Sequence, residues 1–169
     1  MAIITNPATW GWAAVIVAMA ALVTQTWWQI KIAKEQLRVN FYLKLRDQFD
    51  SLEFRRSRQF LAQQLLAKVF YEGSMTTPSH EEISETVMNF FEDMGTLYRR
   101  NYLDHEMIIQ TFSYHGLGWW NACKEYILEE RKRHNGDQTL FSDFEKLVSV
   151  WQGLPTADVK DFLHEELKI

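Results

Sequence analysis

The stretch that decides the fold is WGWAAVIVAMAALVTQTWWQI, residues 10–30, which contains no charged residue. The uncharged run begins at Pro7, directly after Asn6, a residue pair typical of a helix start. From there to Ile30, an α-helix would extend about 36 Å, which exceeds the roughly 30 Å hydrocarbon core of a bilayer. Indole rings favour the membrane–water interface, and four tryptophans are placed for two such belts: Trp10, Trp12, Trp27 and Trp28. The stretch is therefore predicted to be a transmembrane anchor.

Two other interpretations of this stretch stay open. Ala18-Met19-Ala20 has the small-x-small form of a signal-peptidase site, so the segment could be a cleaved leader. Against cleavage, no Lys or Arg precedes the apolar run, and the run continues past the possible cut. The third interpretation is a buried helix of a soluble domain. A retained anchor agrees best with the length of the run and the paired tryptophans.

The charges that flank the anchor predict its orientation. Before the run the only positive charge is the α-amino group, whereas Lys31, Lys34 and Arg38 follow it with only Glu35 opposing. Because cytoplasmic flanks carry the excess of Lys and Arg, we expect the C-terminal side to be cytoplasmic and the N-terminus outside. The same three cations are expected to contact lipid headgroups.

The charge balance changes sign along the chain. Residues 31–58 hold eight basic and four acidic side chains, whereas residues 59–169 hold ten basic and eighteen acidic ones. A basic collar suits an anionic membrane surface, and an acidic distal part stays off it. The acidic part also argues against nucleic acid as a partner. A merely solvated helix end would explain the collar equally well.

Small residues recur along one face of the predicted anchor, at spacings of three and four. The row, which we call the small-residue seam, consists of Gly11, Ala14, Ala18, Ala21 and Gln25. Small side chains let a second transmembrane helix approach closely, and the Gln amide can hydrogen-bond across the contact. The seam predicts an integral membrane protein partner or a homo-oligomer. Ordinary span composition is the alternative, since alanine is common in membrane helices.

The helix is expected to continue beyond the anchor to about Phe49, because neither Gly nor Pro occurs between Gly11 and Gly73. Two apolar stripes lie on opposite sides of this segment. The first is Ile30, Ala33, Leu37, Phe41 and Leu45, and the second, which we call the partner stripe, is Ile32, Val39 and Leu43. A surface helix normally needs one stripe. Either the chain's own domain covers both sides, or a partner covers the second stripe.

Capping and stop signals predict about five further helices and no strand, since no segment alternates with period two. The expected helices run from Asp50 to about Tyr71, from Thr77 or Ser79 to about Tyr98, from Asp104 to Arg133, from Asp137 to Trp151 and from Thr156 onward. The fold class is thus all-α. We expect an anchor at residues 1–30, a basic juxtamembrane helix at 31–50, and a cytoplasmic helical bundle at 51–169.

The densest aromatic segment is TFSYHGLGWWNACKEYI, residues 111–127. Its apolar stripe contains Gly116, and a helix-interior glycine costs about 0.5–1 kcal/mol relative to alanine. Close approach of another helix is the expected compensation, and a ligand cleft is the alternative. Gly118 is expected off the stripe, tolerant of larger side chains. Cys123, the only cysteine, lies on the stripe and is expected to be inert.

Recognisable reaction chemistry is scarce in this sequence. There is no Gly-rich phosphate loop, no nucleophile elbow and no pair of Glu-x-x-His motifs for a carboxylate-bridged metal pair. His115 is expected at the edge of the core. Glu92 is expected to point away from the core, and Asp93 to pair with an arginine of the preceding helix. Asp161 and His164 have ligand-like spacing but no companion. We expect no enzyme activity, no catalytic residue, no metal, no cofactor and no small-molecule substrate.

Three segments carry a resemblance to a known family. They are NFFEDMGTLYRRNYLD at 89–104, TFSYHGLGWW at 111–120 and EERKRHNGDQTLFSDFEKL at 129–147. The chain resembles a family of uncharacterised bacterial membrane-anchored helical proteins, described as a domain of unknown function. The resemblance covers residues 80–150 and departs from the family pattern at Gly116 and Gly118, where bulkier residues are expected. It implies a helical protein tethered to the bacterial inner membrane, and it supplies no activity.

The function expected from these features is that of a non-catalytic single-span membrane protein. It would act as an accessory or scaffold subunit that binds a larger membrane complex or itself. An oligomerising membrane-acting effector in stress or phage response is the alternative. An enzyme that uses Glu92, Asp93 and His115 is the least favoured interpretation, since the sequence shows no known site.

Overall fold

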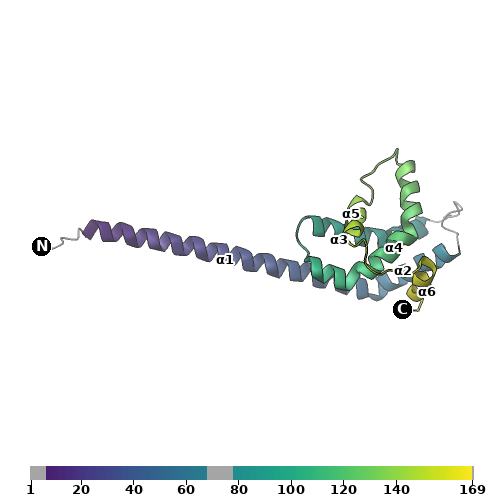
Figure 1. The fold of residues 1–169 in the computed structure, drawn as a ribbon, viewed down its shortest axis with the longest axis horizontal. Helices are drawn as coiled ribbons and strands as arrows, with labels where there is room; N and C mark the ends of the chain where they lie inside the picture. Colours follow the sequence, from purple (N-terminus) through teal and green to yellow (C-terminus); the bar gives the residue numbers. More distant parts are fainter. Residues whose placement is uncertain (1–6, 68–77, 169) are drawn as a thin grey trace. The chain divides into compact units, whose positions relative to one another are not determined.

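The computed structural model describes residues 7–67 and 78–168, with side chains described for residue 12 and for residues 14–67 and 85–168. These residues form six α-helices and no β-strand (Figure 1). The helices are α1 (Pro7–Asp50), α2 (Leu52–Leu66), α3 (Pro78–Arg99), α4 (His105–Arg133), α5 (Ser142–Val150) and α6 (Val159–Glu166). The predicted fold class, one long apolar N-terminal helix followed by a bundle of five helices, is confirmed.

The chain divides into two compact units, Met1–Val39 and Asn40–Ile169. In the first unit, α1 is long and apolar enough to cross a membrane, and none of its apolar window is buried. The second unit contains the last part of α1, from Asn40 to Asp50, together with α2 to α6. Part of the predicted juxtamembrane helix therefore packs within the bundle.

Caps and turns show why the bundle's helices begin and end where they do. Asp104 caps α4 as predicted, because its carboxylate accepts the backbone N–H groups of Glu106 and Met107. The predicted stop after Arg133 is also present, with Gly136 in the left-handed region at φ 79°. The predicted end of α2 near Tyr71 and the loop at 72–80 fall largely outside the described residues.

Three predicted helix starts are misplaced. Ser51, not Asp50, caps α2 through its hydroxyl. The last helix begins after Asp158, not at Thr156, because the Asp158 carboxylate accepts the N–H of Lys160. Asp137 closes a short turn by accepting the N–H and hydroxyl of Thr139, so α5 starts only at Ser142. At Ser51 and Asp158 the N-cap lies one or two residues beyond the predicted start, and only at Asp137 does a side-chain turn compete with a helix start.

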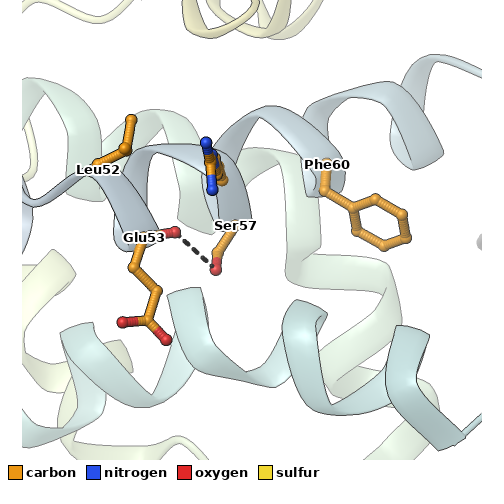
Figure 2. Close-up of a pocket in the computed structure, with 5 residues that line it drawn as sticks. Leu52, Glu53, Ser57 and Phe60 are labelled. Atoms are coloured by element: carbon orange, nitrogen blue, oxygen red, sulfur yellow. Dashed lines mark hydrogen bonds between the residues drawn. The ribbon is translucent and has the colours of Figure 1, made fainter.

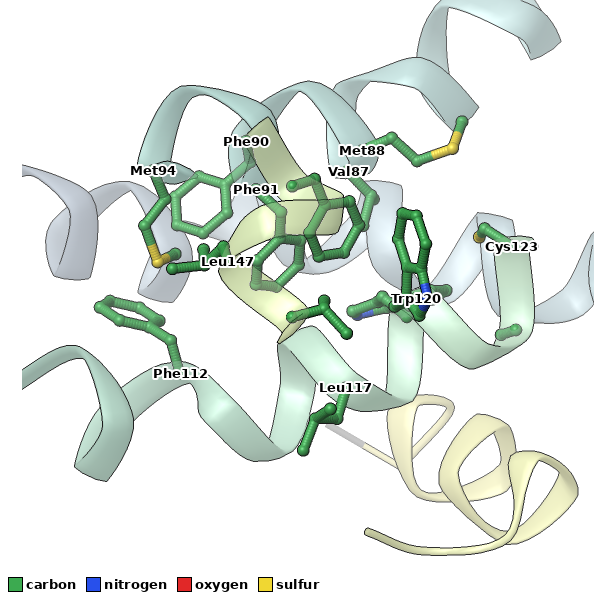
Figure 3. Close-up of a cluster of buried hydrophobic side chains, with 14 of the residues drawn as sticks. Val87, Met88, Phe90, Phe91, Met94, Phe112, Leu117, Trp120, Cys123 and Leu147 are labelled. Atoms are coloured by element: carbon green, nitrogen blue, oxygen red, sulfur yellow. The ribbon is translucent and has the colours of Figure 1, made fainter. Parts of the chain in front are cut away.

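The core of the second unit lies where α3, α4 and α5 meet, and aromatic rings fill much of it (Figure 3). Phe91 of α3 stacks on Phe144 of α5 with ring centroids 5.0 Å apart, and Trp120 of α4 meets the same Phe144 edge-on at 5.2 Å. Offset stacks and edge-on contacts of this kind add stability beyond the apolar area that they bury. The three helices are thus joined around one aromatic cluster.

Three glycines allow close approach between elements of the bundle. A Cβ atom at Gly95 would lie 2.3 Å from the backbone oxygen of Asp143, so α3 and α5 touch there. On α4, a Cβ at Gly116 would lie 2.2 Å from the ring of Trp151, and one at Gly118 would lie 2.4 Å from the ring of Phe162.

Gly116 and Gly118 lie on two different faces of α4, and both faces are buried. The structure places Gly116 at a close contact, with an aromatic ring rather than a helix backbone on the other side. The expectation that Gly118 lies off the packed surface is wrong, because α6 covers that side of α4.

Candidate functional site

The surface of α1 before Asn40 is the first candidate site. From residue 14 to residue 37 every side chain is exposed, although most of residues 14–30 are apolar. The seam members Ala14, Ala18, Ala21 and Gln25 belong to this exposed surface. Gly11 and Trp10 lie outside the residues whose side chains are described. A contiguous apolar surface of this size marks a site of contact with a membrane or another protein.

Polar side chains within this apolar run differ in whether they form hydrogen bonds within the helix. The Thr24 and Thr26 hydroxyls each donate to the backbone carbonyl four residues earlier, at 2.8 Å. Such internal bonds suit an apolar surrounding, where no water is present to accept them. Among the described residues, the Gln25 amide has no hydrogen-bond partner. Gln25 is therefore the seam residue with unused hydrogen-bonding capacity.

At the C-terminal end of the apolar run, aromatic and cationic groups lie together. The rings of Trp27 and Trp28 meet edge-on, with centroids 6.2 Å apart. The Lys31 ammonium lies 5.7 Å from the centroid of each ring. Arg38 pairs with Glu35 at 3.0 Å. Indoles beside an ammonium match the layered chemistry of a lipid interface, where apolar chains give way to anionic headgroups.

The second candidate site is the partner stripe of Ile32, Val39 and Leu43. In the first unit, Ile32 and Val39 are exposed; in the second, Leu43 is 46% exposed. Two residues further along α1, Leu45 is only 6% exposed and belongs to the core. The bundle therefore covers one side of the segment after Asn40 and leaves the side that carries Leu43 open.

A buried charged cluster joins three helices of the bundle. The Arg58 guanidinium of α2 donates two bonds to the Glu166 carboxylate of α6, at 2.9 and 3.2 Å, and both side chains are almost completely buried. His115 of α4 places Nδ1 2.7 Å from the same carboxylate. This partner favours the tautomer in which Nδ1 carries the proton.

Aromatic rings complete the surroundings of this cluster. The guanidinium of Arg58 lies 4.1 Å from the ring centroid of Phe49. Burial lowers the pKa of Arg58, while the charge of Glu166 acts in the opposite direction. The expected core-edge position of His115 agrees with its partial exposure. Sequence reasoning named Arg58 only as a possible partner of Asp93 and missed its pairing with Glu166, since 108 positions separate the two residues and no local pattern links them.

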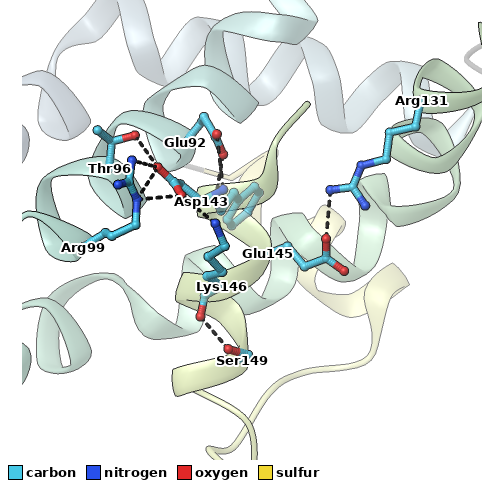
Figure 4. Close-up of polar contacts among 9 residues, drawn as sticks. Glu92, Thr96, Arg99, Arg131, Asp143, Glu145, Lys146 and Ser149 are labelled. Atoms are coloured by element: carbon cyan, nitrogen blue, oxygen red, sulfur yellow. Dashed lines mark hydrogen bonds and ion pairs between the residues drawn. The ribbon is translucent and has the colours of Figure 1, made fainter. Parts of the chain in front are cut away.

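A second polar cluster holds the start of α5 against α3 (Figure 4). Glu92 accepts the backbone N–H groups of Asp143 and Phe144, at 3.2 and 2.7 Å, and so caps α5 from another helix. Asp143 accepts bonds from Arg99 and from the Thr96 hydroxyl, both at 2.8 Å. The bond from Arg99 lowers the pKa of Asp143 to about 2.

The expectations for the acidic pair of α3 are wrong. Glu92 does not point away from packed elements, because α5 covers that side of α3, and burial raises its pKa. Asp93 is exposed and forms no ion pair within the described part of the chain. Two arginines of the preceding helix have other partners: Arg58 pairs with Glu166 and Arg55 with Asp50.

The remaining chemistry-bearing residues show no assembled centre. Cys123 is fully buried, and burial raises the pKa of its thiol to about 12, so the thiolate nucleophile is scarce at neutral pH. Within residues 7–67 and 78–168, no three His, Cys, Asp or Glu side chains come together as a metal site. Asp161 and His164 thus remain without a third ligand in the described residues.

The bundle surface is hollowed in several places. A broad hollow of about 700 Å³ lies beside α2 and is lined by Leu52, Glu53, Arg56, Ser57 and Phe60 (Figure 2). Its one internal polar contact, from the Ser57 hydroxyl to the Glu53 carbonyl at 3.2 Å, stays within the helix. Two smaller hollows lie between helices, one of about 220 Å³ beside α1 and α3 and one of about 380 Å³ beside α2, α4 and α6.

Comparison with known proteins adds a family and no activity. No curated protein and no solved structure matches the chain. Among protein families, Domain of unknown function (DUF4760) matches residues 9–151, which include α1 and the elements through α5. The match covers most of the chain and includes the three segments whose pattern first indicated a family. The protein is therefore a member of the DUF4760 family, whose function is not defined.

Proposed function

We propose that this protein is a single-span membrane protein that serves as a non-catalytic accessory or scaffold subunit. It binds a larger membrane complex, or a second copy of itself, through α1. The observation that carries the proposal is the open face of α1, where Leu43 stays 46% exposed although Leu45 on the same helix is buried. The bundle thus uses only one side of α1 and leaves an apolar stripe unused.

The proposal places the anchor in the inner membrane of a bacterium, with the N-terminus outside and the bundle in the cytoplasm. The uncharged length of residues 7–30 supports a full span. The cations Lys31, Lys34 and Arg38 support the orientation, since positive flanks stay cytoplasmic. The contact of Lys31 with two exposed indoles supports an interfacial position for this turn of the helix.

Contact within the membrane would run along the small-residue seam. Helices in lipid associate through close packing and interhelical hydrogen bonds, because lipid tails are as apolar as the side chains they surround. Ala14, Ala18 and Ala21 leave room for a second backbone, and the Gln25 amide has bonds to offer. Outside the membrane, Ile32, Val39 and Leu43 would extend the same partner's contact along α1.

Photocross-linking tests this proposal in native membranes. A photoreactive residue at Ala18 or Leu43 should capture one defined partner or a second copy, whereas the same probe at Leu128 of the bundle should not. Leu128 is a suitable control because it is 44% exposed, much like Leu43. Equal capture at all three sites, or capture of lipid alone at Ala18 and nothing at Leu43, would contradict the proposal.

A matched pair of variants distinguishes the seam from general apolarity. Ala18→Leu should weaken a complex that survives mild detergent, because added bulk separates the two backbones. Ile16→Leu conserves volume on another face and should leave the complex intact. Loss of the complex in both variants, or in neither, would mean that the alanine row is ordinary span composition.

The alternative function, an oligomerising membrane-acting effector in stress or phage response, draws on the same seam. A seam of small residues with one amide is self-complementary, so it suits identical helices. The cross-linked product decides between the two functions. A ladder of many copies of the chain favours the effector, whereas a dimer or a product with a different protein favours the accessory subunit.

A further inference from the structure

The hollow of about 220 Å³ in the second unit lies between the last part of α1 and α3. Its floor is apolar: Leu45 and Phe90 are almost completely buried, and Phe41 and Leu97 are half-buried. Phe41 and Leu97 therefore offer aromatic and branched aliphatic surface to an occupant, whereas Leu45 and Phe90 expose almost none. Pockets of this kind, apolar with a few polar groups at fixed positions, are the usual form of a small-molecule site.

Polar side chains of opposite charge line the two walls. Lys44 and Gln48 come from α1, and Asp93 and Thr96 come from α3. Lys44 and Asp93 do not pair with each other within 4.0 Å, and neither has an ion-pair partner among the described residues. The Thr96 hydroxyl donates its proton to Asp143, so its oxygen can still accept a bond from an occupant.

Size and charge together restrict the occupant. A volume of 220 Å³ equals that of about seven waters at roughly 30 Å³ each, which suits a ligand of amino-acid size better than a nucleotide. A ligand with only a negative charge would place a like charge near Asp93. A ligand with only a positive charge would place a like charge near Lys44. A molecule with both charges and an apolar tail can pair with Lys44 and Asp93 on the walls and pack its tail on the apolar floor.

We propose that this hollow binds a free α-amino acid with a branched aliphatic or aromatic side chain. Asp93 receives the ammonium, Lys44 receives the carboxylate, and the side chain lies on Phe41 and Leu97. The site lies wholly within residues 40–169, so it does not depend on the proposed membrane function. Bound there, the amino acid would contact both α1 and α3.

Binding measurements on the whole protein in detergent micelles test the site with three probes. L-leucine carries both charges, 4-methylpentanoate lacks the ammonium, and 3-methylbutylamine lacks the carboxylate. For so small a ligand we expect a dissociation constant on the order of 1 mM or tighter for leucine. Each single-charge probe should bind at least tenfold more weakly. Equal binding of all three, tighter binding of either single-charge probe, or no binding of leucine at 10 mM would overturn the proposal.

Charge-removing variants localise the binding. Lys44→Gln and Asp93→Asn should each weaken leucine binding about tenfold, and both residues are exposed, so the bundle should fold normally. The matched controls are Lys160→Gln and Glu125→Gln, which remove the same charges at the hollow of about 380 Å³. The controls should bind leucine as the unmodified chain does. An equal loss in the controls, or no loss in the first pair, would overturn the assignment to this hollow.

Discussion

The α1 segment before Asn40 and the bundle after it use the same side-chain types in opposite ways. Trp27 and Trp28 of the first are more than half exposed, whereas Trp119 and Trp151 of the second are completely buried. In the bundle, apolar side chains pack against one another, and their burial is the bundle's main source of stability. In the first segment, the side chains of residues 14–37 are all exposed. The same residue types therefore form a core in one region and an exposed apolar surface in the other.

The same contrast recurs inside the second unit on a single helix. Leu45 and Phe49 of α1 are buried in the bundle, while Leu43 is 46% exposed. The bundle covers the side of α1 that carries Leu45 and Phe49 and leaves the side that carries Leu43 exposed. The open side is thus a feature of the fold rather than of the anchor alone. Variants that change one region and not the other test whether the two regions are independent.

The largest expected effect comes from Glu166→Ala. This change leaves the Arg58 guanidinium buried without its carboxylate, which typically costs about 3–5 kcal/mol of unfolding free energy. Lys34→Met in the other region changes an exposed side chain that has no ion pair among the described residues, and it should leave the bundle unchanged. Urea unfolding in micelles, followed by hydrogen exchange in α4 and α6, gives both values. Similar losses in the two variants would mean that the regions are not independent.

The next effect separates the two sides of α1. Leu45→Ala should destabilise the bundle by about 2–5 kcal/mol, because a buried leucine is lost and a cavity is left. Leu43→Ala should change stability by less than about 0.5 kcal/mol and should instead weaken partner capture. The same urea measurement checks the stability of both. A destabilised Leu43→Ala variant would show that the side carrying Leu43 is covered after all.

A smaller loss is expected from added bulk at the glycines of α4. Gly118→Ala forces a methyl group against the Phe162 ring and should cost about 1–3 kcal/mol. Ala18→Leu, a larger addition in the exposed segment, should leave the unfolding of the bundle unchanged. Thermal unfolding followed at the α6 amides measures the difference. If Gly118→Ala left the stability unchanged, position 118 would lie off the packed surface, as the sequence predicted.

The smallest effect is a pH dependence confined to the bundle. The pKa of Asp143, held at about 2 in the folded state by Arg99, lies below the roughly 3.9 of an unfolded Asp. Its contribution is therefore fully present above about pH 4 and is lost as the pH falls towards 2.

Asp143→Asn should remove this contribution. The variant should be less stable than the unmodified chain by about 1 kcal/mol at pH 7, since Arg99 is half exposed. The two stability profiles, measured by urea unfolding from pH 2 to 7, should converge near pH 2. Parallel profiles over this range would show that the ion pair contributes nothing.

Sequence reasoning predicted the elements whose signals are local. The uncharged length of residues 7–30 predicted the apolar helix, and Asp104 with Asn135-Gly136 predicted the limits of α4. Such signals depend on a few neighbouring residues and on no knowledge of tertiary contacts. They fail where a turn and a helix cap compete for the same side chain. At Asp137 the carboxylate closes a turn with Thr139 instead of opening a helix.

The contacts of α4 and α3 could not be predicted, because a helical wheel with one buried stripe assumes one packed side. The ring of Trp151 lies against Gly116 and that of Phe162 against Gly118, so α4 is packed on two sides. In the same way α5 covers the side of α3 that carries Glu92. Which distant element covers a face depends on topology, and no spacing in the sequence encodes it.

The central claim is that the apolar segment of α1 is retained in a bilayer while the bundle is in water. A spin label at Ile16 or at Leu128, in a Cys123→Ala chain reconstituted into liposomes, tests it through collision with oxygen and with a water-soluble nickel chelate. We predict that the Ile16 label collides mainly with oxygen and the Leu128 label mainly with the chelate. A chain that is recovered without its first residues, or an Ile16 label as open to the chelate as the one at Leu128, would contradict the account.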